Sequence, residues 1–162
     1  MLDHRLSQVD FNNRQAYAEM LSRMSAPLSA FEIGLSAGIA PVLFTSWASR
    51  LRGHALRKDL IALEAPFRAR AVAPIEDEAE ALGALYVLEG SRLGGQVLAR
   101  MASASADPVV RNATRYFRHG ERQGLWRTFL DRLESSRAVR DNPERAKRGA
   151  VNAFEAFEAA FA

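Results

Sequence analysis

Apolar residues recur along the chain at steps of three and four positions, which is the spacing of one face of an α-helix. The first stripe predicts a helix that begins after Asn12 and Asn13, because asparagine side chains cap helix starts well. The stripe contains Tyr17, Met20, Leu21, Met24, Leu28 and Phe31. Pro27 lies inside it, and we expect this proline to kink or split the helix.

Further stripes predict helices along the rest of the chain. They lie within residues 42–51, 56–63, 82–101, 125–133 and 151–161. Asp107-Pro108 and Asn142-Pro143 are typical helix starts, and the first of these helices should extend through Phe117. The acidic run from Glu76 to Glu80 also favours a helix start, because carboxylates interact favourably with the positive end of the helix dipole. No segment keeps the alternation of a β-strand, so the pattern predicts an all-α, single-domain protein.

Three glycines interrupt the stripe between Leu82 and Met101, namely Gly90, Gly94 and Gly95. Each costs about 1 kcal/mol relative to alanine inside a helix, which is roughly 3 kcal/mol out of a typical stability of ~5–15 kcal/mol. Gly90 and Gly94 share a helix face, Gly95 should widen the bare strip, and glycines also let a helix bend. Either a second helix packs tightly on this strip, or a flat, rigid ligand lies across it. The spacing alone does not decide between these interpretations.

Composition excludes several classes of protein. The chain has 162 residues, of which 48% are hydrophobic and 25% charged, as in ordinary globular domains. The net charge is only +3 and no dense basic run occurs, so we expect no nucleic-acid partner. Without cysteine, disulfides and thiolate sites are excluded. No stretch has the length of a membrane span and no apolar signal region follows Met1, so we expect no membrane partner and a cytoplasmic location.

The glycine segment carries a resemblance to a known family. Residues 82–98 read LGALYVLEGSRLGGQVL, and this resembles the distal-helix signature of the haem oxygenase family. The similarity is strongest to the bacterial branch that makes biliverdin for bacteriophytochromes. Residues 56–63, 120–133 and 154–157 also resemble the family, and the likeness extends from about Leu2 to the end of the chain. It implies a single all-α domain in which haem lies between a proximal helix and a kinked distal helix, and in which haem, O2 and electrons yield biliverdin, CO and iron.

The resemblance also implies roles for particular residues. Gly90, Gly94 and Gly95 would form the distal wall, and Ser91 would take the place of a small polar residue near an ordered water network. Tyr86 matches a tyrosine that hydrogen-bonds a haem propionate in some bacterial members; its alternative role is that of a half-buried aromatic residue. Several arginines could meet propionates in the same way, although we expect most of them to form a solvated surface.

The sequence departs from the family at its N-terminus. In bacterial members the proximal histidine lies about four residues before an aspartate that corresponds to Asp3, so we expect it to be missing from an N-terminally shortened domain. His4 is the nearest candidate for an axial ligand, but it is displaced by about 7 Å along a helix and roughly 140° around it. His54 and His119 have the pattern of surface residues near helix ends, where a cation helps the dipole. No two histidines have metal-ligand spacing, so the sequence predicts no metal site.

These observations lead to one hypothesis with two alternatives. The leading hypothesis is a degenerate haem oxygenase-like domain over residues 1–162 that cleaves haem weakly or not at all. It would hold no cofactor tightly and would act as a homodimer, or with a protein partner, in binding or regulation. One alternative is an active haem oxygenase, which requires either His4 as an unusual ligand or a true start of the protein upstream of Met1. The other is a tetrapyrrole carrier that holds haem or biliverdin without an iron ligand.

Overall fold

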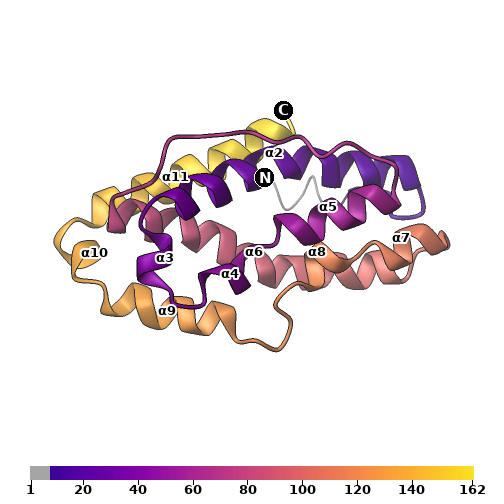
Figure 1. The fold of residues 1–162 in the computed structure, drawn as a ribbon. Coiled ribbons are helices and arrows are strands. Elements are labelled where there is room, and N and C mark those ends of the chain that lie inside the picture. Colours follow the sequence, from indigo (N-terminus) through magenta and orange to yellow (C-terminus); the bar gives the residue numbers. More distant parts are fainter. Residues whose placement is uncertain (1–7) are drawn as a thin grey trace.

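The computed structural model describes residues 8–162, and all regular structure in this part of the chain is helical (Figure 1). The helices are α2 (Arg14–Ala37), α3 (Ala40–Leu43), α4 (Trp47–Arg50), α5 (Gly53–Ala62), α6 (Glu78–Ser103), α7 (Pro108–Asn112), α8 (Arg115–Arg118), α9 (Leu125–Ser135), α10 (Arg137–Asp141) and α11 (Pro143–Ala160). The predicted all-α, single-domain fold is therefore confirmed. Within the described residues, no helix is both long enough and apolar enough to span a bilayer.

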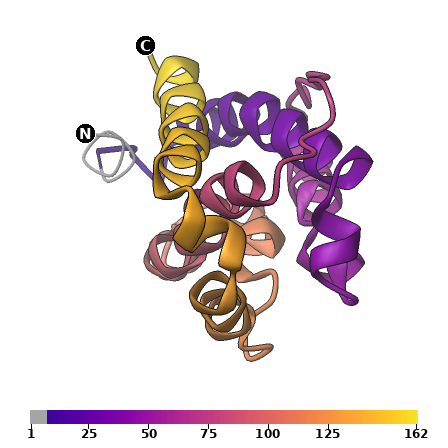
Figure 2. The same ribbon diagram turned by 90° about the vertical axis from the view of Figure 1, so that its left-hand side faces the viewer.

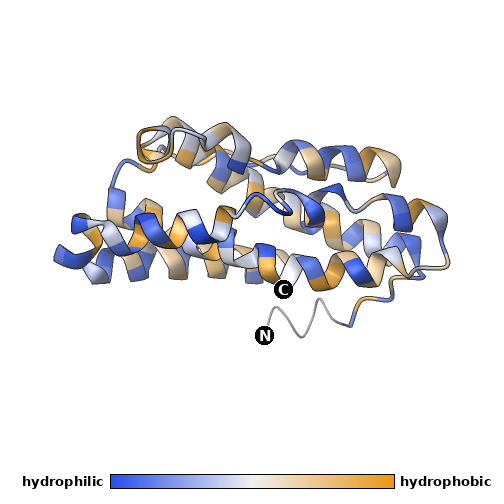
Figure 3. Ribbon diagram, turned by 90° about the horizontal axis from the view of Figure 1, so that it is seen from below, coloured by the Kyte–Doolittle hydropathy of each residue, from blue (hydrophilic) through white to orange (hydrophobic). Residues whose placement is uncertain are grey.

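Helix α6 lies at the centre of the molecule. Figure 2 shows it end-on, with α2 and α11 on one side and α9 on the other. The three long helices start where the sequence predicts, because the side chains of Asn13, Asp77 and Asn142 each accept a hydrogen bond from a backbone N–H three residues further on. Hydrophilic and hydrophobic residues alternate along the helices in Figure 3, as expected when each helix has one face in the core and one in solvent.

Helices α6 and α11 cross with their backbones in direct contact. A Cβ atom added at Gly83 would lie 1.8 Å from the carbonyl oxygen of Ala146, and one added at Gly149 would lie 2.1 Å from that of Glu80. Only glycine fits at either position. The tight packing of two helices on bare backbone thus occurs at this crossing and fixes the first half of α6 in place.

Residues 63–77, which we call the strap, connect α5 to α6 and run along α2 (Figure 1). Serine side chains of α2 hold it. The Ser22 hydroxyl donates to the carbonyl oxygen of Pro66 at 2.7 Å, and the N–H groups of Arg68 and Arg70 donate to the hydroxyls of Ser25 and Ser29. These bonds satisfy backbone groups that have no partner in a regular element.

Two expectations about helix boundaries were wrong, and a third was wrong in part. Helix α2 is not split at Pro27, because the residues on both sides pack into the same core. The stripe at 42–51 forms two short helices, α3 and α4, since Phe44, which follows α3, and Trp47, the first residue of α4, are both buried. The helix from Pro108 ends at Asn112 and α8 follows separately, because Asp59 accepts a hydrogen bond from the N–H of Tyr116.

Candidate functional site

Five residues of α6 form a strip, exposed except at the partly buried Gly90, that we call the glycine face: Tyr86, Gly90, Leu93, Gly94 and Val97. At about 100° per residue they fall within an arc of roughly 100° around the helix. The three side chains are about half exposed, with Tyr86 at 49%, Leu93 at 51% and Val97 at 48%. Large apolar side chains exposed together along one helix commonly mark a binding surface.

The glycines differ in what lies in front of them. No described atom lies within 4 Å of a Cβ added at Gly94, whereas one added at Gly90 would meet the Trp126 ring at 3.5 Å. Gly95 is buried against Phe117, so the expectation that it widens the bare strip was wrong. Helix α6 stays helical through all three glycines. Among the described residues, only Gly94 of the three is therefore bare backbone with open space in front of it, whereas Trp126 of α9 lies over Gly90.

Aromatic residues of α9 border this face. The Tyr86 ring lies 5.6 Å from that of Trp126 and 6.5 Å from that of Phe129, between centroids, and Trp126 stacks on Phe129. The sequence placed Trp126 and Phe129 only on an apolar helix stripe and gave no signal that they would meet Tyr86. Tyr86 is thus an aromatic residue packed on one side and exposed on the other.

Ser91 is held at the edge of the glycine face by Arg52. The Ser91 hydroxyl donates to the carbonyl oxygen of Leu88 at 2.7 Å and accepts a hydrogen bond from Nη2 of Arg52, which also donates to Leu88 at 2.8 Å. Arg52 is only 3% exposed, and burial lowers the pKa of its guanidinium. Its Cζ lies 4.8 Å from the centre of the Tyr116 ring.

Behind the face, Glu89 forms a buried ion-pair cluster. Its carboxylate lies 2.7 Å from Nε of Arg92 and 3.3 Å from Nη1 of Arg50. Arg50 also donates to the carbonyl oxygen of Leu125 and the hydroxyl of Thr128, so the cluster ties α4 and α6 to α9. Nε of Arg50 has no hydrogen-bond partner among the residues that the structure describes.

Three arginines are buried, although we expect most arginines of this chain to lie on a solvated surface: Arg50, Arg52 and Arg92. All three are less than 9% exposed. Their sequence neighbours are ordinary helix formers and polar residues, which do not distinguish a buried arginine from an exposed one. Glu89, inside an apolar stripe, was the available signal for a buried counter-charge.

The described histidines lie away from the glycine face. Nη1 of Arg92 is 3.2 Å from Nδ1 of His119, and the rings of His119 and His54 meet edge to face at 5.3 Å. Arg92 follows Gly90 by two positions, which is about 200° around the helix. Burial lowers the pKa of His119 to about 4, and His54 stands at the start of α5, so the expectation that both stabilise helix dipoles as cations was wrong. His4 and Asp3 lie outside the described residues.

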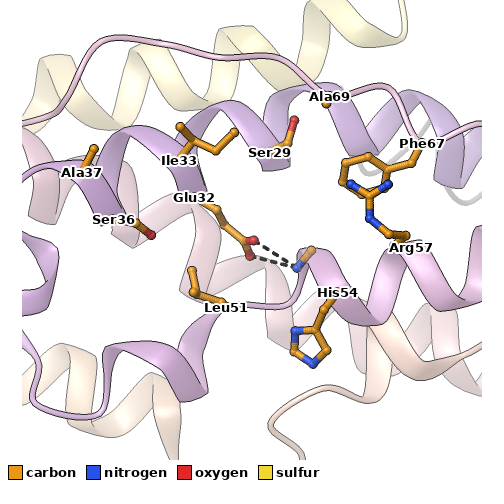
Figure 4. Close-up of a pocket in the computed structure, with 11 residues that line it drawn as sticks. Ser29, Glu32, Ile33, Ser36, Ala37, Leu51, His54, Arg57, Phe67 and Ala69 are labelled. Atoms are coloured by element: carbon orange, nitrogen blue, oxygen red, sulfur yellow. Dashed lines mark hydrogen bonds between the residues drawn. The ribbon is translucent and has the colours of Figure 1, made fainter.

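A second concave region lies between α2, α5 and the strap (Figure 4). This pocket has a volume of about 540 Å³. On its wall the Glu32 carboxylate accepts hydrogen bonds from the N–H groups of Arg52 and Gly53, and Cζ of Arg57 lies 4.0 Å from the centre of the Phe67 ring. Glu32 therefore caps α5 and fixes the backbone of the residue that holds Ser91.

Comparison with known proteins fits this arrangement. The sequence model of the family described as Heme oxygenase matches residues 7–162. The chain belongs to the haem oxygenase family. It is 38% identical to a protein named Heme oxygenase from Xanthomonas campestris pv. campestris (strain 8004), over 130 residues that cover 77% of this chain and 78% of the relative. The resemblance drawn from residues 82–98 is confirmed, and the all-helical fold is consistent with the haem oxygenase fold.

Proposed function

We propose that this member of the haem oxygenase family binds a tetrapyrrole against the glycine face, acts as a binding or regulatory protein, and cleaves haem weakly or not at all. The observation that carries the proposal is the bare, uncovered backbone at Gly94, flanked by exposed apolar side chains. A flat ring needs such a surface, because a Cβ atom would keep it away from the helix.

The side chains around the strip fit a tetrapyrrole. Leu93 and Val97 would contact the apolar ring, and the half-exposed Tyr86 has a hydroxyl that can donate to a propionate. Bound haem would supply iron that activates O2, a reaction that depends on its axial ligand. Neither His54 nor His119 lies on this face, so the described residues offer iron no imidazole there. This supports weak haem cleavage.

Family membership and the 38% identical relative named Heme oxygenase favour a second candidate, an active haem oxygenase that forms biliverdin. That activity requires an imidazole on the iron, and His4 is the candidate in this sequence. The two candidates therefore differ in one measurable property, which is whether this chain ligates the iron.

Haem titration followed by visible spectroscopy tests the choice, with His4→Ala beside the parent protein. We expect a weak, broad Soret band that is the same in both proteins. A sharp Soret band in the parent that is lost in His4→Ala would make His4 the ligand and reject the proposal in favour of the active enzyme.

Tryptophan fluorescence tests whether the tetrapyrrole binds to the glycine face. The chain contains two tryptophans, and Trp126 lies against Gly90. In Trp47→Phe the remaining Trp126 fluorescence should be quenched as a tetrapyrrole binds. Trp126→Phe, which keeps only Trp47, is the matched control and should show much weaker quenching. Equal quenching in both variants would place the ligand elsewhere.

A further inference from the structure

Trp126 of α9 occupies the space in front of Gly90. Two atoms of its indole, Cζ3 and Cη2, lie 3.5 and 3.6 Å from the position of a Cβ added at Gly90, which is ordinary van der Waals contact. A flat ring bound against the helix backbone would need this same layer, so the indole and the ring cannot both lie over Gly90. Gly94 lies about 6 Å further along the helix axis. No described atom is within 4 Å of a Cβ added there.

The indole of Trp126 is held in place by the core between α6 and α9. Its ring stacks on that of Phe129, with 5.6 Å between centroids and an interplanar angle of 27°. Arg50 fixes the backbone of α9 on both sides of the indole, because it donates to the carbonyl oxygen of Leu125 at 3.1 Å and to the hydroxyl of Thr128 at 2.8 Å. Arg50 is itself buried. Trp126 is therefore a fixed wall beside the glycine face.

We infer that Trp126 determines where a tetrapyrrole lies along the glycine face. Its indole excludes the ring from Gly90 and contacts the ring edge. A tetrapyrrole ring is wider than the step from Gly90 to Gly94, so a ring centred on Gly94 would overlap the indole, and its centre must shift toward Val97, which is exposed. This inference rests on the proposed function, because it requires a tetrapyrrole on this face. It changes the role that the family resemblance implies for Gly90, from a wall of the ligand site to a contact of Trp126.

Alanine substitutions at Gly90 and Gly94 show which of the two glycines the ring contacts. Both positions can take a Cβ atom, because the nearest described atom lies 3.5 Å away at Gly90 and more than 4 Å away at Gly94. Gly90→Ala and Gly94→Ala are each made in the parent, in Trp126→Phe and in Trp126→Ala. Trp126→Phe keeps an aromatic ring beside Phe129 but loses the reach of Cζ3 and Cη2 toward Gly90. The Kd for haem is measured by absorbance titration, which needs no tryptophan.

In the parent we expect Gly94→Ala to raise the Kd for haem about tenfold, because the methyl group keeps the ring away from the backbone. Gly90→Ala should change the Kd by less than about twofold, because Trp126 already covers that position. In Trp126→Ala the ring can reach Gly90, so Gly90→Ala should then raise the Kd about three- to tenfold, with a smaller effect in Trp126→Phe. A purely structural role of Trp126 would change the Kd by the same factor with glycine or alanine at position 90.

Two results would overturn the inference about Trp126. Equal losses for Gly90→Ala and Gly94→Ala in the parent would place the ring over both glycines. An effect of Gly94→Ala alone, in the parent and in both Trp126 variants, would mean that the indole does not limit where the ring lies. If Trp126→Ala does not fold, the comparison between the parent and Trp126→Phe still decides. Haem that does not bind, or that binds with the same Kd to the parent and to Gly94→Ala, would instead reject the proposed function.

Discussion

At the scale of single residues, two glycines of α6 differ in what lies in the space where a side chain would be. Gly83 is bare because the backbone of α11 occupies the space where a side chain would lie, and Gly94 is bare with open space in front of it. Both sit in the same helix with helical backbone angles, so substitution with alanine separates the two purposes.

We predict that Gly83→Ala destabilises the protein by several kcal/mol, because its Cβ would lie 1.8 Å from a backbone oxygen of Ala146. Gly94→Ala should stabilise it by about 1 kcal/mol through helix propensity alone. Urea denaturation measures both changes. The same Gly94→Ala protein should bind haem more weakly, since the methyl group lies on the proposed ring contact. A stabilised Gly94→Ala protein with unchanged haem affinity would contradict that contact.

His119 should be neutral at pH 7 and titrate at about 4, because burial and the neighbouring Arg92 disfavour its charged form. An unfolded histidine titrates near pH 6.5. Between these values the unfolded chain takes up a proton that the folded chain excludes, so the free energy of unfolding falls as the pH drops from about 6.5 to 4. NMR titration of the ring and urea denaturation across this range measure the two effects.

His119→Gln is the control for that prediction, because glutamine cannot titrate but can still accept from Arg92. Its free energy of unfolding should depend less on pH than that of the parent between about pH 4 and 6.5. A parent His119 that titrates at its ordinary pKa would remove the basis for the expected pH dependence.

The sequence predicted the residues of the glycine segment but not their individual surroundings. Spacing places Gly90 and Gly94 on one face, and this holds whatever packs there. Whether a glycine meets a helix or open space depends on contacts between α6 and segments far along the chain, as at Gly83 and Ala146. The buried state of Arg52 was missed for the same reason.

At the scale of elements, Glu89 joins α6 to α4 and, through Arg50, to α9. The carboxylate is 2% exposed, so its charge relies on the two guanidinium groups beside it. Removing one partner from such a buried pair leaves the other charges uncompensated. The cluster therefore fixes where α9 and its Trp126 lie relative to the glycine face.

We predict that Glu89→Ala destabilises the protein by roughly 3–5 kcal/mol. The matched control is Asp141→Ala, which removes the ion pair with Arg137, where the side chains are 66% and 86% exposed. That change should cost less than about 1 kcal/mol. Thermal denaturation compares them. Similar small losses in both variants would mean that the Glu89 cluster does not hold the helices together.

Helix starts were easier to predict than helix ends. Asn13, Asp77 and Asn142 cap their helices through contacts within a few residues, so local sequence contains the whole signal. The breaks after Leu43 and after Asn112 depend on tertiary contacts of Trp47 and Asp59, which local sequence does not show.

At the scale of the whole molecule, the glycine face leaves apolar side chains in solvent, and we expect the unliganded protein to associate through it as a homodimer. Size-exclusion chromatography with light scattering measures this, and haem or biliverdin should shift the equilibrium toward the monomer. A protein that stays monomeric at all accessible concentrations without ligand would contradict the expectation. The cytoplasmic location also remains a prediction.

The crossing at Gly83 and Gly149 also bears on how the protein is made. Synthesis proceeds from the amino end, so α6 leaves the ribosome before α11 exists to cover it. During that interval the Gly83 side of the helix is exposed together with the glycine face, and α6 has bare backbone on both halves. The packing of α6 against α11 can therefore be completed only after translation has passed Gly149.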